Sequence, residues 1–146
     1  MGLRSNGANA GLNANGMPVD ARFFGRAVVF VWFLLGGIAH FVATEAEMRI
    51  VPPVIPWPRA AVLMSGAIEL LGAGGLLWQP TRRASGMGLF ALTIAVTPAH
   101  VYMLQQPELF GVPYWALVLR IPVQVGLLAL IAWSCVLPVP PGCKPV

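Results

Sequence analysis

Ionisable and amide side chains stand inside long apolar runs of this chain, where such groups are rare. They are His40, Glu69, His100, Arg120 and Gln124. An ionisable group is costly in hydrocarbon and survives there mainly by pairing with another group or by lining a wet cavity. A carboxylate and an imidazole can exchange a proton, and a guanidinium donates hydrogen bonds to an oxygen atom. These residues therefore indicate a polar site that binds a polar head group or handles protons.

Their spacing places further polar side chains on the same faces. Residues three or four positions apart share one face of a helix. This spacing joins Ser65 to Glu69, Thr97 to His100, and Arg120 to Gln124. We therefore predict one outward-opening pocket lined by these residues: His40, Ser65, Glu69, Thr97, His100, Arg120 and Gln124.

A structural interpretation of the same residues stays open. Glu69 and Arg120 can form an ion pair that joins the second apolar segment to the fourth. His40 and His100 can bond to loop backbone near the membrane surface. We do not predict a metal site, because neither histidine lies in a spacing typical of metal or haem ligands.

The composition excludes most soluble classes. The chain has 146 residues, of which 58% are hydrophobic and only 10% are charged, whereas a soluble domain has about 25% charged residues. The basic residues are scattered and form no face interleaved with aromatic residues, so nucleic acid is not an expected partner. The expected partner is the lipid bilayer.

Four apolar segments are each close to the ~20 residues that cross a bilayer. We predict helices at about 24–43, 59–78, 84–104 and 112–137, so that residues 21–137 form an all-α, integral membrane four-helix bundle. No useful alternation of apolar and polar residues supports strands. Four prolines within 45–59 make a continuous helix there unlikely to form. Residues 1–20 are expected to be a flexible cytoplasmic tail and residues 138–146 an irregular proline-rich tail.

The placement of Lys and Arg predicts the orientation in the membrane. With the N-terminus inside, the inner side holds the larger set of basic residues, because cytoplasmic loops carry more Lys and Arg. That set is Arg4, Arg22, Arg26, Arg82, Arg83 and Lys144, against Arg49 and Arg59 outside. Both termini and the 79–83 turn are therefore predicted to be cytoplasmic. The inner halves of the spans are expected to lack ionisable groups, which argues against a transporter.

Several segments, in order and with conserved spacing, resemble the DoxX family of small four-span bacterial membrane proteins. The likeness covers about residues 24–136. It rests on Gly37-Ile38-Ala39-His40-Phe41, the proline-rich loop 50–58, Ser65-Gly66-Ala67-Ile68-Glu69-Leu70-Leu71-Gly72, Thr81-Arg82-Arg83, Pro98-Ala99-His100-Val101-Tyr102-Met103 and Leu119-Arg120-Ile121-Pro122-Val123-Gln124. In one respect the chain departs from the family pattern, because His100 stands where the family often has Asn.

The resemblance implies a multi-pass protein of the bacterial inner (plasma) membrane. Some DoxX-like proteins are linked with thiosulfate–quinone oxidoreduction or thiol redox homeostasis, so a quinone is the cofactor to consider. Cys135 and Cys143 lack the CxxC spacing of dithiol redox proteins. An accessory subunit of an oxidoreductase, with a redox enzyme or other membrane subunits as partners, is therefore favoured over an autonomous enzyme. The alternative is a non-catalytic structural or assembly subunit of a larger membrane complex.

Overall fold

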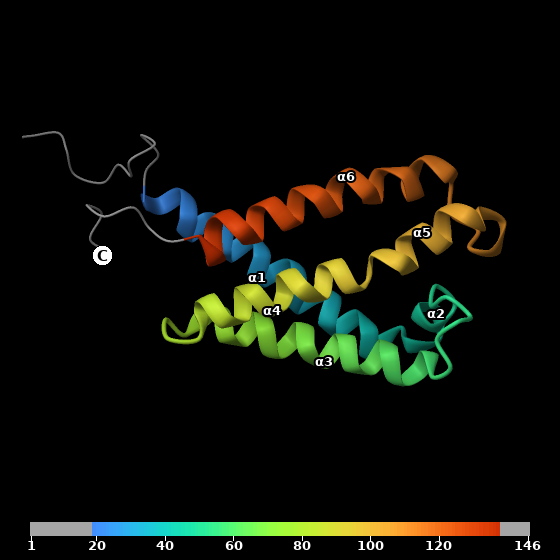
Figure 1. The fold of residues 1–146 in the computed structure, drawn as a ribbon, viewed down its shortest axis with the longest axis horizontal. Coiled ribbons are helices and arrows are strands. Elements are labelled where there is room, and N and C mark those ends of the chain that lie inside the picture. The colour runs from blue at the N-terminus through green and yellow to red at the C-terminus, as the bar shows by residue number, and fades with distance from the viewer. Residues whose placement is uncertain (1–18, 138–146) are drawn as a thin grey trace, which may run out of the picture.

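The computed structural model describes residues 19–137, with side chains placed from Ala21 onward, and every regular element in this range is helical (Figure 1). The elements are α1 (Val19–Val42), α2 (Thr44–Met48), α3 (Pro58–Leu77), α4 (Arg82–Ala95), α5 (Thr97–Gln105), η1 (Pro107–Leu109), α6 (Tyr114–Ile131) and η2 (Ala132–Val136). The prediction of an all-α chain is confirmed for these residues. The predicted tails lie outside the described residues, except that α1 already begins at Val19, within the expected tail 1–20.

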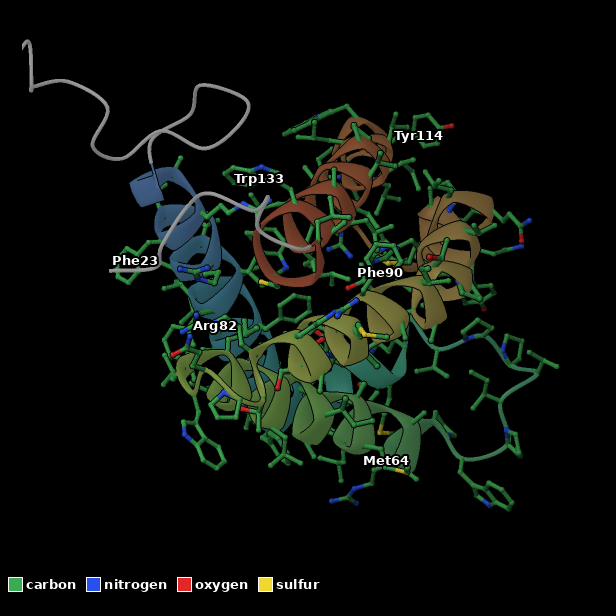
Figure 2. All side chains as sticks on the ribbon, turned by 60° about the vertical axis from the view of Figure 1, so that its left-hand side comes forward. Phe23, Met64, Arg82, Phe90, Tyr114 and Trp133 are labelled. Carbon is green, nitrogen blue, oxygen red and sulfur yellow. The ribbon has the colours of Figure 1, made fainter. Side chains whose placement is uncertain are left out.

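Four helical stretches are long and apolar enough to cross a membrane. They are Ala21–Val42, Pro58–Leu77, Arg82–Gln105 and Tyr114–Val136. Many of their large apolar side chains face outward, as Figure 2 shows, and Phe24 and Leu71 are 71% and 76% exposed. So much exposed apolar surface is typical of contact with lipid or with another protein. The chain thus has the features of a multi-pass membrane protein.

The third stretch is two helices rather than the single span expected at 84–104. α4 ends at Ala95 and α5 begins at Thr97, where the ribbon bends in Figure 1. The cause is Pro98, which has no backbone N–H and whose ring crowds the preceding turn. In contrast, α6 continues through Pro122 and ends in the wider π-helical turn η2.

The predicted loop after the first span contains a short helix, α2. The run Thr44-Glu45-Ala46-Glu47-Met48 precedes the prolines and forms one turn of helix before them. The Thr44 hydroxyl donates to the His40 carbonyl at 2.7 Å, which ties α2 to the end of α1. This short helix carries Glu47 over one end of the bundle.

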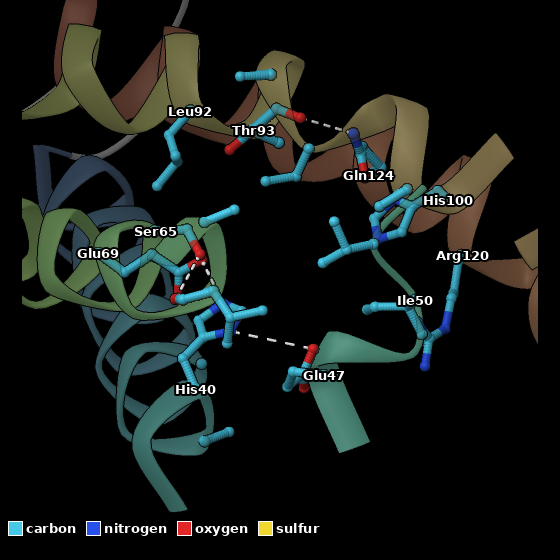
Figure 3. A pocket seen from close by; sticks show the side chains of 18 of the residues that line it. His40, Glu47, Ile50, Ser65, Glu69, Leu92, Thr93, His100, Arg120 and Gln124 are labelled. Atoms are coloured by element: carbon cyan, nitrogen blue, oxygen red, sulfur yellow. Dashed lines mark hydrogen bonds and ion pairs between the residues drawn. The ribbon is translucent and has the colours of Figure 1, made fainter. Parts of the chain in front are cut away.

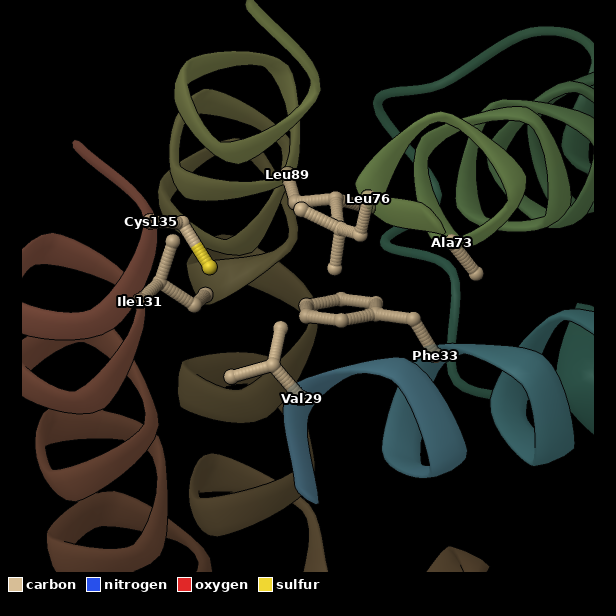
Figure 4. Packing of buried hydrophobic residues seen from close by; sticks show 7 residues of the cluster. All are labelled: Val29, Phe33, Ala73, Leu76, Leu89, Ile131 and Cys135. Carbon is tan, nitrogen blue, oxygen red and sulfur yellow. The ribbon is translucent and has the colours of Figure 1, made fainter. Parts of the chain in front are cut away.

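The apolar core lies at the end of the bundle opposite α2. Figure 4 shows side chains from all four long stretches meeting there: Val29, Phe33, Ala73, Leu76, Leu89, Ile131 and Cys135. In a membrane such contacts stabilise the bundle by close packing rather than by removal of water. The helices are therefore held together at this end, and a cavity lies between them at the other.

The α1–α3 pair has the most extensive contact in the structure, and glycines allow it. A Cβ atom on Gly66 would lie 2.6 Å from the His40 Cβ, and one on Gly37 would lie 2.8 Å from the Leu70 side chain. Small residues at such crossings let two backbones approach closely. This approach brings the polar residues of α1 and α3 into contact.

Candidate functional site

A cavity of about 770 Å³ lies between the helices on the side of α2 and α5. Its walls come from α1, α3, α4, α5, α6 and the loop after α2, and most of the lining is apolar. The polar lining residues are His40, Glu47, Ser65, Glu69, Thr93, His100, Arg120 and Gln124. This volume and this largely apolar lining with a few polar groups are typical of small-molecule sites.

The cavity has two different polar walls. Figure 3 shows Glu69, Ser65 and His40 on one side, His100 and Arg120 on the other, and Glu47 near the open space between them. Of the residues predicted for the pocket, only Thr97 is not part of this lining; it lies in an adjoining depression on the surface.

The acidic wall is built around Glu69, which is only 9% exposed. The His40 Nε2 atom lies 3.4 Å from the Glu69 Oε1 atom, and the His40 Nδ1 atom lies 4.0 Å from the Glu47 Oε2 atom. A carboxylate, an imidazole and a second carboxylate thus follow one another from the more exposed Glu47 to the buried Glu69. The His40–Glu69 pair can hold a proton, whereas 4.0 Å is too long for a hydrogen bond to Glu47, and the His40 Nδ1 atom has no hydrogen-bond partner among the described residues.

The ion pair between Glu69 and Arg120 that the structural interpretation allows does not form. Among residues 19–137, Glu69 pairs with His40, and no carboxylate pairs with Arg120. The Arg120 Nη1 atom instead donates to the Met103 sulfur at 3.4 Å, and a thioether is a weak acceptor. The reason is the α1–α3 contact, which puts the imidazole beside the carboxylate, while Arg120 stands on α6 across the cavity.

The second wall has polar groups without good hydrogen-bond partners. The His100 Nδ1 atom is shielded from solvent and has no partner among the described residues. Arg120 lies within electrostatic range of His100, and four of its N–H groups remain after the bond to sulfur. A ligand oxygen that entered the cavity could reach the exposed Arg120 guanidinium, which lines it (Figure 3).

Gln124 and Ser65 are occupied by the protein itself. The Gln124 Nε2 atom donates to the Thr93 carbonyl and to the Thr97 hydroxyl, both at 2.8 Å. These bonds span the break between α4 and α5, so Gln124 holds the two helices to α6. The Ser65 hydroxyl donates to the Val62 carbonyl at 2.8 Å. Both side chains therefore have structural hydrogen bonds within the protein.

Sequence reasoning missed three residues of this region. Glu47 was placed in a loop, although its helix-forming neighbours signal the short helix that carries it. Thr93 and Met103 are absent from the predicted set, yet Thr93 lines the cavity and Met103 accepts a hydrogen bond from Arg120. Nothing in the sequence predicts the contact between Met103 and Arg120, because it depends on the direction of α5 after Pro98.

The comparisons with known proteins place the chain in a family without naming its activity. No curated protein and no solved structure matches the chain. Residues 29–137, which include every residue of the cavity wall described above, match a family described as "Domain of unknown function (DUF8561)". The chain belongs to the DUF8561 family.

Proposed function

We propose that this chain is a redox-associated subunit of the bacterial inner membrane that binds a quinone, or a similar small lipophilic ligand with an oxygen-bearing head, in the cavity. The observation that carries the proposal is Arg120, a cavity-lining guanidinium that pairs with no carboxylate among the described residues and donates to the weak acceptor Met103. Arg120 is exposed along the cavity, so its free N–H groups can donate to the oxygen of a ligand.

The shape of the lining supports a ligand with an apolar body. Trp32, Val123 and Leu127 are among the many apolar residues that would contact a ring or an isoprenoid chain. A carbonyl oxygen of the head would accept hydrogen bonds from Arg120, and the opposite side of the head would face His40 and Glu69 (Figure 3). Apolar burial would then provide most of the affinity and the donors would fix the orientation.

The acidic wall supports a role in proton exchange. Reduction of a quinone to a quinol takes up electrons and protons at its oxygens. In this proposal the electrons come from a partner oxidoreductase, and the protons come from the His40–Glu69 pair, which Glu47 reloads from the exposed side. The chain is then an accessory subunit and not an autonomous enzyme, in line with the DoxX resemblance.

The distribution of charge supports the proposed orientation. Arg22, Arg26, Arg82 and Arg83 stand at the end of the bundle away from the cavity (Figure 1). Since basic residues favour the cytoplasmic side, both termini would be cytoplasmic and the cavity would open toward the outer leaflet.

Titration with a short-chain quinone analogue tests the proposal, with quenching of tryptophan fluorescence as the readout, since Trp32 lines the cavity. Arg120→Gln should weaken binding about tenfold, the loss expected for one charged hydrogen bond. Arg59→Gln is the control, because Arg59 is exposed and outside the cavity lining. If folded Arg120→Gln protein binds as wild type does, or if wild type does not bind, the alternative of a non-catalytic structural or assembly subunit is favoured.

A further inference from the structure

A second group of cations lies at the opposite end of the bundle and takes no part in the proposed function. It consists of Arg22 and Arg26 of α1 and Arg82 and Arg83 of α4, near the end of α6 (Figures 1 and 2). Arg26 lies within electrostatic range of both Arg82 and Arg22. Arg22, Arg26 and Arg82 are half-buried, whereas Arg83 is exposed.

Two of these guanidinium groups are held in place by the protein. The Arg22 Nη1 atom donates to the Leu137 carbonyl at 3.1 Å, and its guanidinium carbon lies 5.9 Å from the centre of the Trp133 ring. The Arg82 Nε atom donates to the Leu76 carbonyl at 3.2 Å. Each bond uses one of the five N–H groups of a guanidinium, so both side chains are positioned and still have donors free.

Nothing among the described side chains neutralises this charge. The carboxylates within residues 21–137 are Glu45, Glu47, Glu69 and Glu108, which lie on α2, in the middle of α3 and on η1. Among these residues, ion pairs occur only around His40. Half-buried cations that repel one another cost free energy unless an anion joins them. The Arg22 Nε atom is shielded and has no hydrogen-bond partner among the described side chains, so a donor is free there as well.

We propose that Arg22, Arg26 and Arg82 bind the phosphate of an anionic phospholipid from the surrounding membrane. The planar fork of arginine suits the oxygens of a phosphate group. If the long helices span the bilayer, these residues lie at head-group depth, where basic groups attract anionic lipids. Phe23 and Trp78 are exposed beside them and offer apolar surface to the acyl chains. This site is independent of whatever occupies the cavity.

The test is native mass spectrometry of the full chain released from mild detergent, with phosphatidylglycerol or phosphatidylcholine added. Wild type is expected to retain phosphatidylglycerol in preference to phosphatidylcholine. The double variant Arg26→Gln/Arg82→Gln should lose roughly thirtyfold in affinity for phosphatidylglycerol, the loss expected when two basic groups are removed from a membrane surface. Arg59→Gln, at the other end of the molecule, should bind as wild type does.

Three results would overturn the proposal. Wild type that retains both lipids equally shows that no anionic head group is selected, and this comparison needs no variant. If the folded double variant has unchanged affinity for phosphatidylglycerol, the lipid binds elsewhere on the protein. Inorganic phosphate that displaces the lipid at equal concentration shows a site for a small anion and not for a membrane lipid.

Discussion

At the level of single residues, the sequence predicts which ionisable side chains line the cavity but not which of them pair. His40, Glu69 and Arg120 stand out because ionisable groups are rare in apolar segments, and all three line the cavity. Which of them pair could not be derived, because pairing depends on which helices are neighbours and how each is rotated. The close α1–α3 contact selects His40 for Glu69 and leaves Arg120 without a carboxylate partner among the described residues.

His40→Ala should destabilise the bundle by roughly 3 kcal/mol, because it leaves the buried Glu69 carboxylate without its partner. The thermal midpoint of the protein in mild detergent measures the effect. Glu47→Gln is the matched control, since Glu47 is more exposed and its oxygen lies 4.0 Å from the imidazole. Equal midpoints for both variants and wild type would contradict the Glu69–His40 pairing.

At the scale of elements, hydropathy predicts the long helices well, but it does not predict their breaks. Prolines are present in both the third and the fourth stretch, yet only Pro98 interrupts its helix. Gln124 stabilises the break between α4 and α5, because its amide group donates hydrogen bonds to the Thr93 carbonyl and the Thr97 hydroxyl. The short helix α2 was missed because one turn of helix between an apolar segment and a proline-rich loop has little periodicity to detect.

Gln124→Leu should destabilise the protein by about 2 kcal/mol, because it keeps the size of the side chain but removes two buried hydrogen bonds. The thermal midpoint again provides the measurement. Val125→Ala, at an exposed neighbouring position, should leave the midpoint within the experimental error. If the leucine variant is as stable as wild type, Gln124 does not hold the break together.

Gly66→Ala tests the crossing of α1 and α3. The added methyl group would lie 2.6 Å from the His40 Cβ atom, so the helices must separate, at a cost of about 2 kcal/mol. Gly74→Ala on the same helix has no heavy atom within 4 Å of the new Cβ and should be neutral or slightly stabilising. Two variants of equal stability would show that the crossing tolerates a larger residue.

On the scale of the whole molecule, the two ends of the bundle differ in kind. One end has the packed apolar core and the arginine cluster of α1 and α4, and the other has the cavity with Glu47, Glu69 and Arg120 in its lining. The sequence predicts this division in part, since basic residues cluster in the predicted inner segments. It misplaces Arg26, however, which lies inside the first long helix although the inner halves were expected to lack ionisable groups.

The charge asymmetry predicts that the C-terminus faces the cytoplasm. A green fluorescent protein fused there, which matures only in the cytoplasm, should fluoresce in bacterial cells. An alkaline phosphatase fusion at the same point should be inactive, because that enzyme needs the oxidising outer compartment. The opposite pattern would invert the proposed orientation and place the cavity on the inner side.

The central claim is that the cavity receives a lipophilic ligand whose oxygen bonds to Arg120. An experimental structure of the full chain in lipid with a bound quinone analogue tests it most directly. The account predicts the head of the analogue between the two polar walls, with an oxygen within hydrogen-bonding distance of the Arg120 guanidinium. A cavity filled only by lipid tails, or one closed by a direct contact between Arg120 and Glu69, would contradict it.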